Sequence, residues 1–138
     1  MRLDTQWLLR ALATCGLSAT LALAASPPSY DFTGHWTGTT TLPQHGQPVA
    51  YTVNGDFTAT GADTFTGILS VVGAETDCTV DGRRARKVKI RLGCPDGTKP
   101  HLKGRLDTTT GTIIGAVSFV SRHGKPKHGT FTLMKTSG

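Results

Sequence analysis

The sequence predicts an all-β domain, and three observations support this prediction. Beyond residue 30, apolar residues recur at every second position, and no run keeps helical spacing for longer than chance would give. The alternating segments are short and evenly spaced, with Gly, Pro, Asp and Asn between them. About eight short antiparallel strands fit a small up-and-down barrel, because closure removes exposed sheet edges; a β-sandwich is the alternative.

The predicted strands follow one another at short intervals. The second is the clearest, because Tyr51, Val53 and Phe57 share one face whereas Thr52 and Asn54 share the other. One face of each strand should therefore lie in the core and the other in solvent. In chain order the predicted strands cover residues 31–42, 49–58, 64–72, 76–81, 87–93, 100–107, 112–121 and 129–136.

The N-terminal segment has the pattern of an export signal. Arg2 and Arg10 flank a short polar start, residues 11–23 are mostly apolar, and small residues at 22–24 suit a signal peptidase. The apolar stretch is too short for a transmembrane helix. We therefore expect an exported protein, periplasmic or extracellular, without a transmembrane span. Its expected parts are a signal peptide (1–24), a leader (25–30) and a single barrel domain (31–138).

Charge and cysteine content narrow the classes of partner and cofactor. The chain has 15 Lys and Arg against 9 Asp and Glu, and the formal net charge of +6 favours anionic partners. In an exported chain Cys15 leaves with the signal, and Cys78 and Cys94 are expected to form a disulfide. A metal site or a reactive thiol is the alternative, but the two cysteines lack Cys-x-x-Cys spacing and a nearby histidine. No metal or other cofactor is expected.

The disulfide also selects a register for the strands that contain it. If Cys78 lies across from Cys94, Val80 faces Leu92 and the hairpin tip falls at residues 84–87. A tight turn at residues 81–82 is the alternative, but it would place the two cysteines too far apart to bond. The bonded register is therefore preferred.

The segment Pro95-Asp96-Gly97 fits a three-residue hairpin loop, in which Pro opens a type I turn and Gly takes the left-handed position. This turn places Ile90 opposite Leu102 on the inner face. The outward side chains of the two strands are then all basic or histidine. They form three opposed pairs: Arg91 with His101, Lys89 with Lys103, and Lys87 with Arg105.

Like charges directly opposite one another destabilise a sheet, so the six residues suggest a patch for an anionic partner. A polysaccharide, a lipid headgroup or an acidic protein surface would fit. The alternative is that the long side chains are simply solvated and screened. Nucleic acid is disfavoured, because export argues against it and no aromatic side chains interleave with the charges.

The first predicted strand carries a family resemblance. Trp36 lies between Gly34 and Gly38, and this arrangement resembles the Gly-x-Trp opening of lipocalin-like and avidin-like (calycin-type) barrels. The resemblance implies a barrel in which Trp36 is a structural plug at the floor. Avidin-type proteins have an Asn where this chain has Gly38, so biotin binding is not implied. Lipocalin-like bacterial relatives include both peptidase inhibitors and carriers of small ligands.

Two segments carry apolar residues on both faces. Residues 112–121 place Ile114 and Val120 on the face opposite Ile113, and residues 64–72 add Ile68 to this pattern. Apolar residues on both faces predict burial on both sides. A homo-oligomer is one way to cover the outer face.

Catalysis has little support in the sequence. The five histidines are scattered, and no Ser or Cys nucleophile has an evident base and orienting group. We expect a non-catalytic, lipocalin-like binding protein that recognises an anionic or small amphipathic ligand through its basic outer face or the barrel mouth. The alternatives are a secreted peptidase inhibitor, which would insert the proline-containing loop 42–48 or the leader, and a structural protein of the cell envelope.

Overall fold

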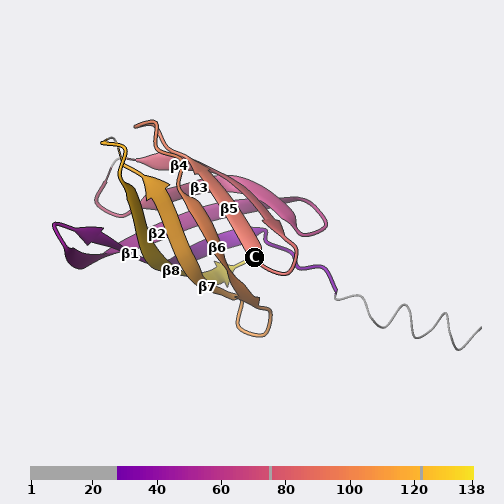
Figure 1. Cartoon of the computed structure of the whole chain (residues 1–138). Coiled ribbons are helices and arrows are strands. Elements are labelled where there is room, and N and C mark those ends of the chain that lie inside the picture. The colour runs from indigo at the N-terminus through magenta and orange to yellow at the C-terminus, as the bar shows by residue number, and fades with distance from the viewer. Residues whose placement is uncertain (1–27, 75, 122) are drawn as a thin grey trace, which may run out of the picture.

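The computed structural model describes residues 28–74, 76–121 and 123–138, which form one closed barrel of antiparallel strands (Figure 1). The expected signal peptide, residues 1–24, and the first part of the expected leader lie outside the described residues. Within the described ranges, no helix is long and apolar enough to cross a membrane.

Each strand pairs with the next one in sequence, and the last pairs with the first. This closure confirms the predicted up-and-down barrel and excludes the β-sandwich. The strands are β1 (Gly34–Gln44), β2 (Gln47–Gly61), β3 (Thr64–Val71), β4 (Asp77–Arg84), β5 (Val88–Gly93), β6 (His101–Asp107), β7 (Thr112–Val120) and β8 (Pro126–Ser137).

The observed register between β5 and β6 agrees with the predicted turn. Ile90 pairs with Leu102, and both side chains are buried in the core. The backbone N–H of Cys94 donates to the Thr98 carbonyl at 3.0 Å, and Gly97 has a φ of 86°. A left-handed residue at this position is what the predicted three-residue loop requires.

The predicted disulfide is also present. The Cys78 and Cys94 sulfurs are bonded, which joins β4 to the connection between β5 and β6. Val80 pairs with Leu92, as the bonded register requires. The tip of the β4–β5 hairpin lies at residues 85–87, where the Ala85 N–H donates to the Lys87 carbonyl at 3.1 Å.

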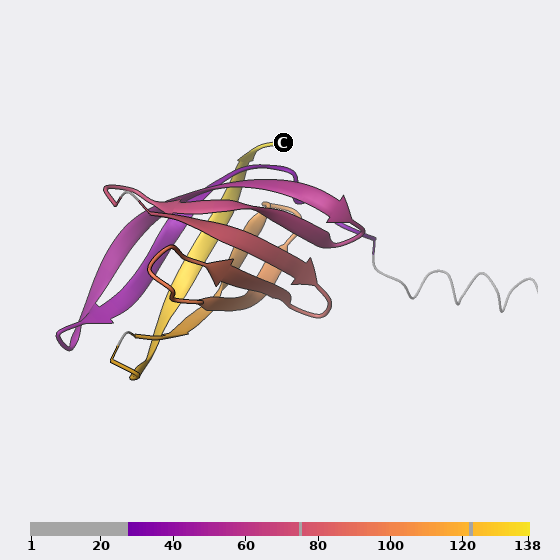
Figure 2. The ribbon, with the colours of Figure 1, turned by 90° about the horizontal axis from the view of Figure 1, so that it is seen from above.

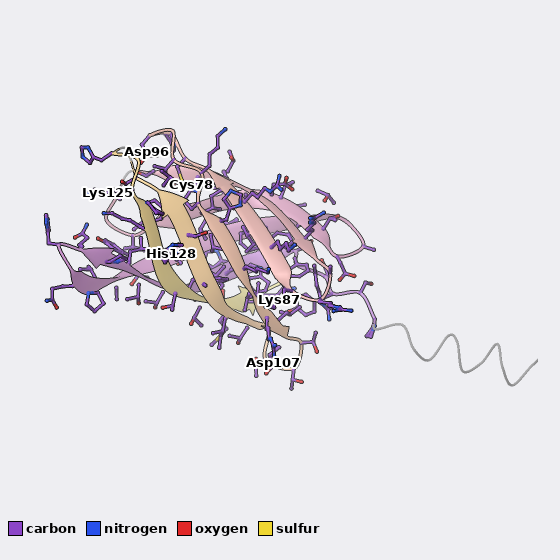
Figure 3. The ribbon with its side chains drawn as sticks, viewed as in Figure 1. Cys78, Lys87, Asp96, Asp107, Lys125 and His128 are labelled. Atoms are coloured by element: carbon purple, nitrogen blue, oxygen red, sulfur yellow. A yellow bond between two sulfur atoms is a disulfide. The ribbon has the colours of Figure 1, made fainter. Side chains whose placement is uncertain are left out.

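The two ends of the barrel carry different connections (Figure 2). The connections β1–β2, β3–β4, β5–β6 and β7–β8 lie at one end, which we call the mouth. The remaining connections and residues 28–33, which we call the N-terminal strap, lie at the other end, the closed end. Figure 3 shows Asp96 and Lys125 at the mouth and Lys87 and Asp107 at the closed end.

Stacked aromatic side chains fill the closed end. Phe65 lies between Phe32 and Phe57, with ring centroids 4.3 and 5.0 Å apart, respectively. Trp36 has no exposed surface, and its Nε1–H donates to the Phe32 carbonyl at 3.0 Å. This hydrogen bond satisfies the indole's one donor in an otherwise apolar site.

Two glycines allow this packing. A Cβ at Gly38 would overlap the carbonyl oxygen of Thr132 on β8, so glycine lets β1 and β8 approach closely. A Cβ at Gly82 would overlap the ring of Phe65, so the missing side chain on β4 makes room for the aromatic cluster.

The N-terminal strap differs from the predicted first strand. Residues 31–33 were expected to open that strand, but β1 begins at Gly34 and the strap crosses the closed end of the barrel. The buried ring of Phe32 covers Phe65 there, and the Tyr30 N–H donates to Asp63 Oδ1 at 3.0 Å. Arg84 Nη1 holds the same segment by donating to the Pro28 carbonyl at 3.2 Å.

Two titratable groups on the N-terminal strap have shifted pKa values. The backbone and hydroxyl of Thr33 hydrogen-bond Asp31, which lowers the pKa of that carboxyl, and the positive charge of Lys135 lowers it further. Partial burial raises the pKa of the Tyr30 phenol, and the negative charge of Asp31 raises it further. Both shifts depend on the folded position of the strap.

The proline-containing segment 42–48 was expected to be a loop, and this expectation was wrong. Pro43 pairs with Pro48, so the segment is the end of the β1–β2 hairpin. His45 and Gly46 form its tight turn with φ values of 50° and 79°. Left-handed values at both central residues are typical of a type I′ hairpin turn.

In the single chain the outer faces of residues 64–72 and 112–121 are exposed, so burial on both sides stays a prediction that requires a second covering surface. Ile114 and Val120 on β7 are 60% and 59% exposed, and Ile68 on β3 is 48% exposed. Their inward neighbours, Ile113 and Val117, are buried. Each of these strands therefore faces the core on one side only.

Candidate functional site

The mouth opens into an apolar cavity of about 280 Å³, which we call the mouth cavity. Its wall is built from inward side chains of most strands of the barrel, because alternate residues of each strand point inward. The main apolar residues of this wall are Leu42, Val53, Leu69, Val71, Leu92 and Leu133. The disulfide between Cys78 and Cys94 forms part of the same wall.

A few polar groups accompany this apolar lining. The hydroxyl of Thr40 donates to the Thr130 carbonyl at 3.2 Å, and the Tyr51 side chain lies among the lining residues. In the β5–β6 connection, Asp96 Oδ1 accepts hydrogen bonds from the Thr98 N–H at 2.9 Å and from the Thr98 hydroxyl at 2.6 Å. Some of the hydrogen-bonding groups at the rim therefore already have partners within the protein.

The shape and lining of the mouth cavity suit a small molecule. A dry apolar cavity of about 150 Å³ can already bind benzene, and typical ligand sites start at about 300 Å³. The mouth cavity lies between these sizes, so it can hold a compact molecule or a single alkyl chain. Inside the barrel, the closed end is filled by aromatic rings.

A second hollow, of about 360 Å³, lies on the outer face of β4, β5 and β6, and we call it the basic groove. Four of the six predicted patch residues line it: Lys89, Arg91, His101 and Lys103. The predicted pairs Lys89 with Lys103 and Arg91 with His101 are both present in the sheet.

The other two predicted patch residues, Lys87 and Arg105, are not part of this groove. The β5–β6 ladder starts with Val88 opposite Gly104, so Lys87 lies before β5 at the hairpin tip and does not face Arg105 in the ladder. The predicted pairing of these two residues was therefore wrong. The ladder between β5 and β6 ends one residue earlier than the predicted register required, because the tip of the β4–β5 hairpin begins there.

Arg83 is a groove residue that the sequence analysis missed. It pairs with Lys89, so Arg83, Lys89 and Lys103 form one row across three strands. The sequence contained the information needed to predict Arg83. The register that the disulfide sets aligns Asp81 with Arg91, and the same register aligns Arg83 with Lys89. Asp81 is the one acidic residue among those that line the groove.

Among residues 28–74, 76–121 and 123–138, Arg84 forms an ion pair with Asp63 and the His35 ring hydrogen-bonds the Asp56 carboxylate, and neither contact lies in the groove. The groove cations form no ion pair within this part of the chain, although Asp81 lies opposite Arg91 on the neighbouring strand. In the same part of the chain, no group of three or more His, Cys, Asp or Glu residues could hold a metal ion.

Comparisons with known proteins bear on the fold. No protein-family model and no curated protein matches the sequence. One similar solved structure is described as "Structure of EF1p2_mFAP2b bound to DFHBI", with a TM-score of 0.60 and 14% sequence identity. The match covers 75% of this chain and 93% of that chain. At this identity the likeness concerns the fold alone, which in this chain is a closed antiparallel barrel of eight strands.

Proposed function

We propose that this protein is an exported, non-catalytic binding protein that takes a small, mainly apolar molecule into the mouth cavity. The observation that carries the proposal is an apolar cavity of about 280 Å³ that opens at one end of a barrel whose other end is filled. The similar solved barrel holds the small molecule DFHBI, which supports a binding role for such a fold. The disulfide is compatible with export.

The driving force for such binding would be the removal of apolar surface from water. Each CH₂ group that enters the cavity contributes about 0.8 kcal/mol, which is about a fourfold gain in affinity. In a series of alkan-1-ols of increasing length, the affinity should rise by about this factor per carbon. It should level off once the chain outgrows the cavity. Displacement of a neutral fluorescent dye such as Nile red would measure the series.

Two neighbouring residues provide a matched pair of variants for this test. Thr40 faces the mouth cavity, whereas Thr39, next to it on β1, is exposed on the outer face. Thr40→Phe should fill the cavity and abolish alcohol binding, and Thr39→Phe should leave it unchanged. Equal affinities for the two variants would contradict the proposal, provided that both unfold at the same temperature as the parent protein.

The basic groove supports a second candidate function, the binding of a polyanion such as a sulfated polysaccharide. The observation that favours it is the row of Arg83, Lys89 and Lys103, in which like charges lie opposite one another. A bound polyanion would offset this repulsion and release counterions, so binding should weaken as salt increases.

Retention on a heparin column tests this second candidate. The double variant Lys89→Gln/Lys103→Gln should elute at clearly lower salt than Arg86→Gln/Lys125→Gln, which removes the same charge elsewhere. Arg86 and Lys125 are exposed and belong to hairpin connections outside the groove. If both double variants elute together, net charge alone explains the retention and the groove is not the site.

A further inference from the structure

The wall of the barrel is incomplete beside the mouth, between β6 and β7. The β6–β7 ladder ends with His101 opposite Ser118. The ladder between β7 and β8 continues further toward the mouth, to Val120 opposite Pro126. The last residues of β7 therefore extend beyond their pairing with β6. We call the space on the mouth side of the His101–Ser118 pair the notch.

A hollow of about 470 Å³ occupies the notch. The residues of this hollow that matter here are Thr98, Lys99, His101, Phe119, Val120 and His128. Thr98 and Phe119 line both the notch and the mouth cavity, so the two spaces adjoin at these residues. A molecule longer than the mouth cavity could therefore continue into the notch without crossing the whole rim.

The chemistry of the notch differs from that of the mouth cavity. Lys99 carries a positive charge, His101 and His128 add two imidazoles, and no Asp or Glu is among the described residues that line the notch. His128 lies near the start of β8, which begins at the mouth with Pro126. The exposed side chain of Val120 adds an apolar surface beside these polar groups.

Asp96 explains why an acidic group would prefer the notch to the mouth cavity. Asp96 is among the residues that line the cavity but not among those that line the notch, and its carboxylate accepts two hydrogen bonds from Thr98. A second negative charge inside the cavity would be repelled by this carboxylate. In the notch the same charge would meet Lys99 instead.

We infer that the ligand of the mouth cavity is an amphiphile with one acidic head group, whose apolar chain lies in the cavity and whose head group lies in the notch. This inference rests on the proposed function, because the cavity must hold the apolar chain. Carboxylate, phosphate and sulfate head groups share the required negative charge. Lys99, His101 and His128 would recognise the head group, and Thr98 and Phe119 would border the chain where it leaves the cavity.

The test compares two ligands that differ only in the head group. Decanoate and decan-1-ol are titrated against the parent protein, and the ratio of their dissociation constants is recorded at pH 7.5. Lys99→Gln should weaken decanoate binding about three- to fivefold and leave decan-1-ol unchanged, as expected for a partly exposed charge pair. Lys99→Glu should shift the ratio further in the same direction. Decyl phosphate and decyl sulfate, measured in the same way, show which head group is preferred.

Arg86→Gln is the matched control, because it removes one positive charge from the hairpin at the closed end. It should leave the ratio unchanged. If Lys99→Gln and Arg86→Gln have the same effect on the ratio, the head group does not lie in the notch and the inference is overturned. If decan-1-ol fails to bind the parent protein as well, the proposed function fails together with the inference. Binding of decan-1-ol that Thr40→Phe abolishes separates the two cases.

Discussion

The two ends of the barrel use the same strands in different ways. At the closed end, the inward positions hold large aromatic residues such as Phe57 and Phe65, and the N-terminal strap adds Phe32. At the mouth, most inward positions hold smaller side chains such as Thr40, Val53 and Leu69, although Tyr51 and Phe119 also line the cavity. The alternation of inward and outward residues is identical at both ends, but the volume of the inward side chains is not.

This difference indicates how one barrel can combine stability with a candidate binding site. Tight packing of large side chains at the closed end supplies much of the apolar burial. The mouth can then leave space unfilled without unfolding the protein.

The largest expected effect comes from removing an aromatic ring at the closed end. Trp36→Ala deletes a fully buried side chain and the hydrogen bond to the Phe32 carbonyl, and it should cost about 3–5 kcal/mol. Leu42→Ala, at the half-buried wall of the mouth cavity, should cost less, because Leu42 already borders empty space. Urea unfolding measures both values. Similar losses in the free energy of unfolding would mean that the two ends contribute equally to stability.

Removal of the disulfide, which lies on the mouth side, should have the next largest effect on stability. Cys78 and Cys94 are 16 residues apart in the sequence, and for a loop of this length their replacement by alanine should cost about 3 kcal/mol. Thermal unfolding of the oxidised and reduced parent protein gives an independent value.

The variant with both cysteines replaced by alanine also tests whether a change at the mouth affects the closed end. In the expected mature chain, Trp36 is the only tryptophan, so its fluorescence reports on the closed end. We expect unchanged Trp36 emission in the folded double variant together with weaker ligand binding in the mouth cavity. A red-shifted emission would show that the mouth and the closed end are coupled.

The smallest expected effect concerns pH and the N-terminal strap. The pKa of Asp31 is lowered in the folded protein, so its contribution to stability is present above the usual value of 3.8 and is lost as pH falls through the folded value. For Tyr30 the pKa is raised, so its contribution is present below 10.0 and is lost as pH rises through the folded value.

The acidic part of this dependence can be removed by one substitution. The urea concentration at half-unfolding should change less between pH 5 and pH 3 for Asp31→Asn than for the parent protein. Asp31 is fully exposed to solvent, so the difference should be small. An identical pH dependence in both proteins would show that the hydrogen bond from Thr33 is not maintained in solution.

The sequence alone could predict the barrel because its main signals are local. Alternation marks each strand, and the turn at Pro95–Gly97 sets the β5–β6 register that places Ile90 opposite Leu102. The position of Phe32 could not be predicted in this way. It depends on contacts with Phe65, on the hydrogen bond from the strap to Asp63 and on the hydrogen bond from Arg84 to the strap, and these residues are distant in the sequence.

The same reasoning applies to the candidate sites. Four residues of the basic groove could be predicted because they follow from the register of one hairpin. The mouth cavity could not, because its volume depends on the sizes of inward side chains from many strands at once. The notch depends on where two ladders end, and alternation does not report the end of a ladder.

The filled floor has a kinetic consequence. With aromatic rings across one end, the molecule resembles a cup more than a tube, so nothing can pass through it from end to end. A ligand of the mouth cavity would have to leave by the route along which it entered, so the rim would also set how long the ligand stays bound.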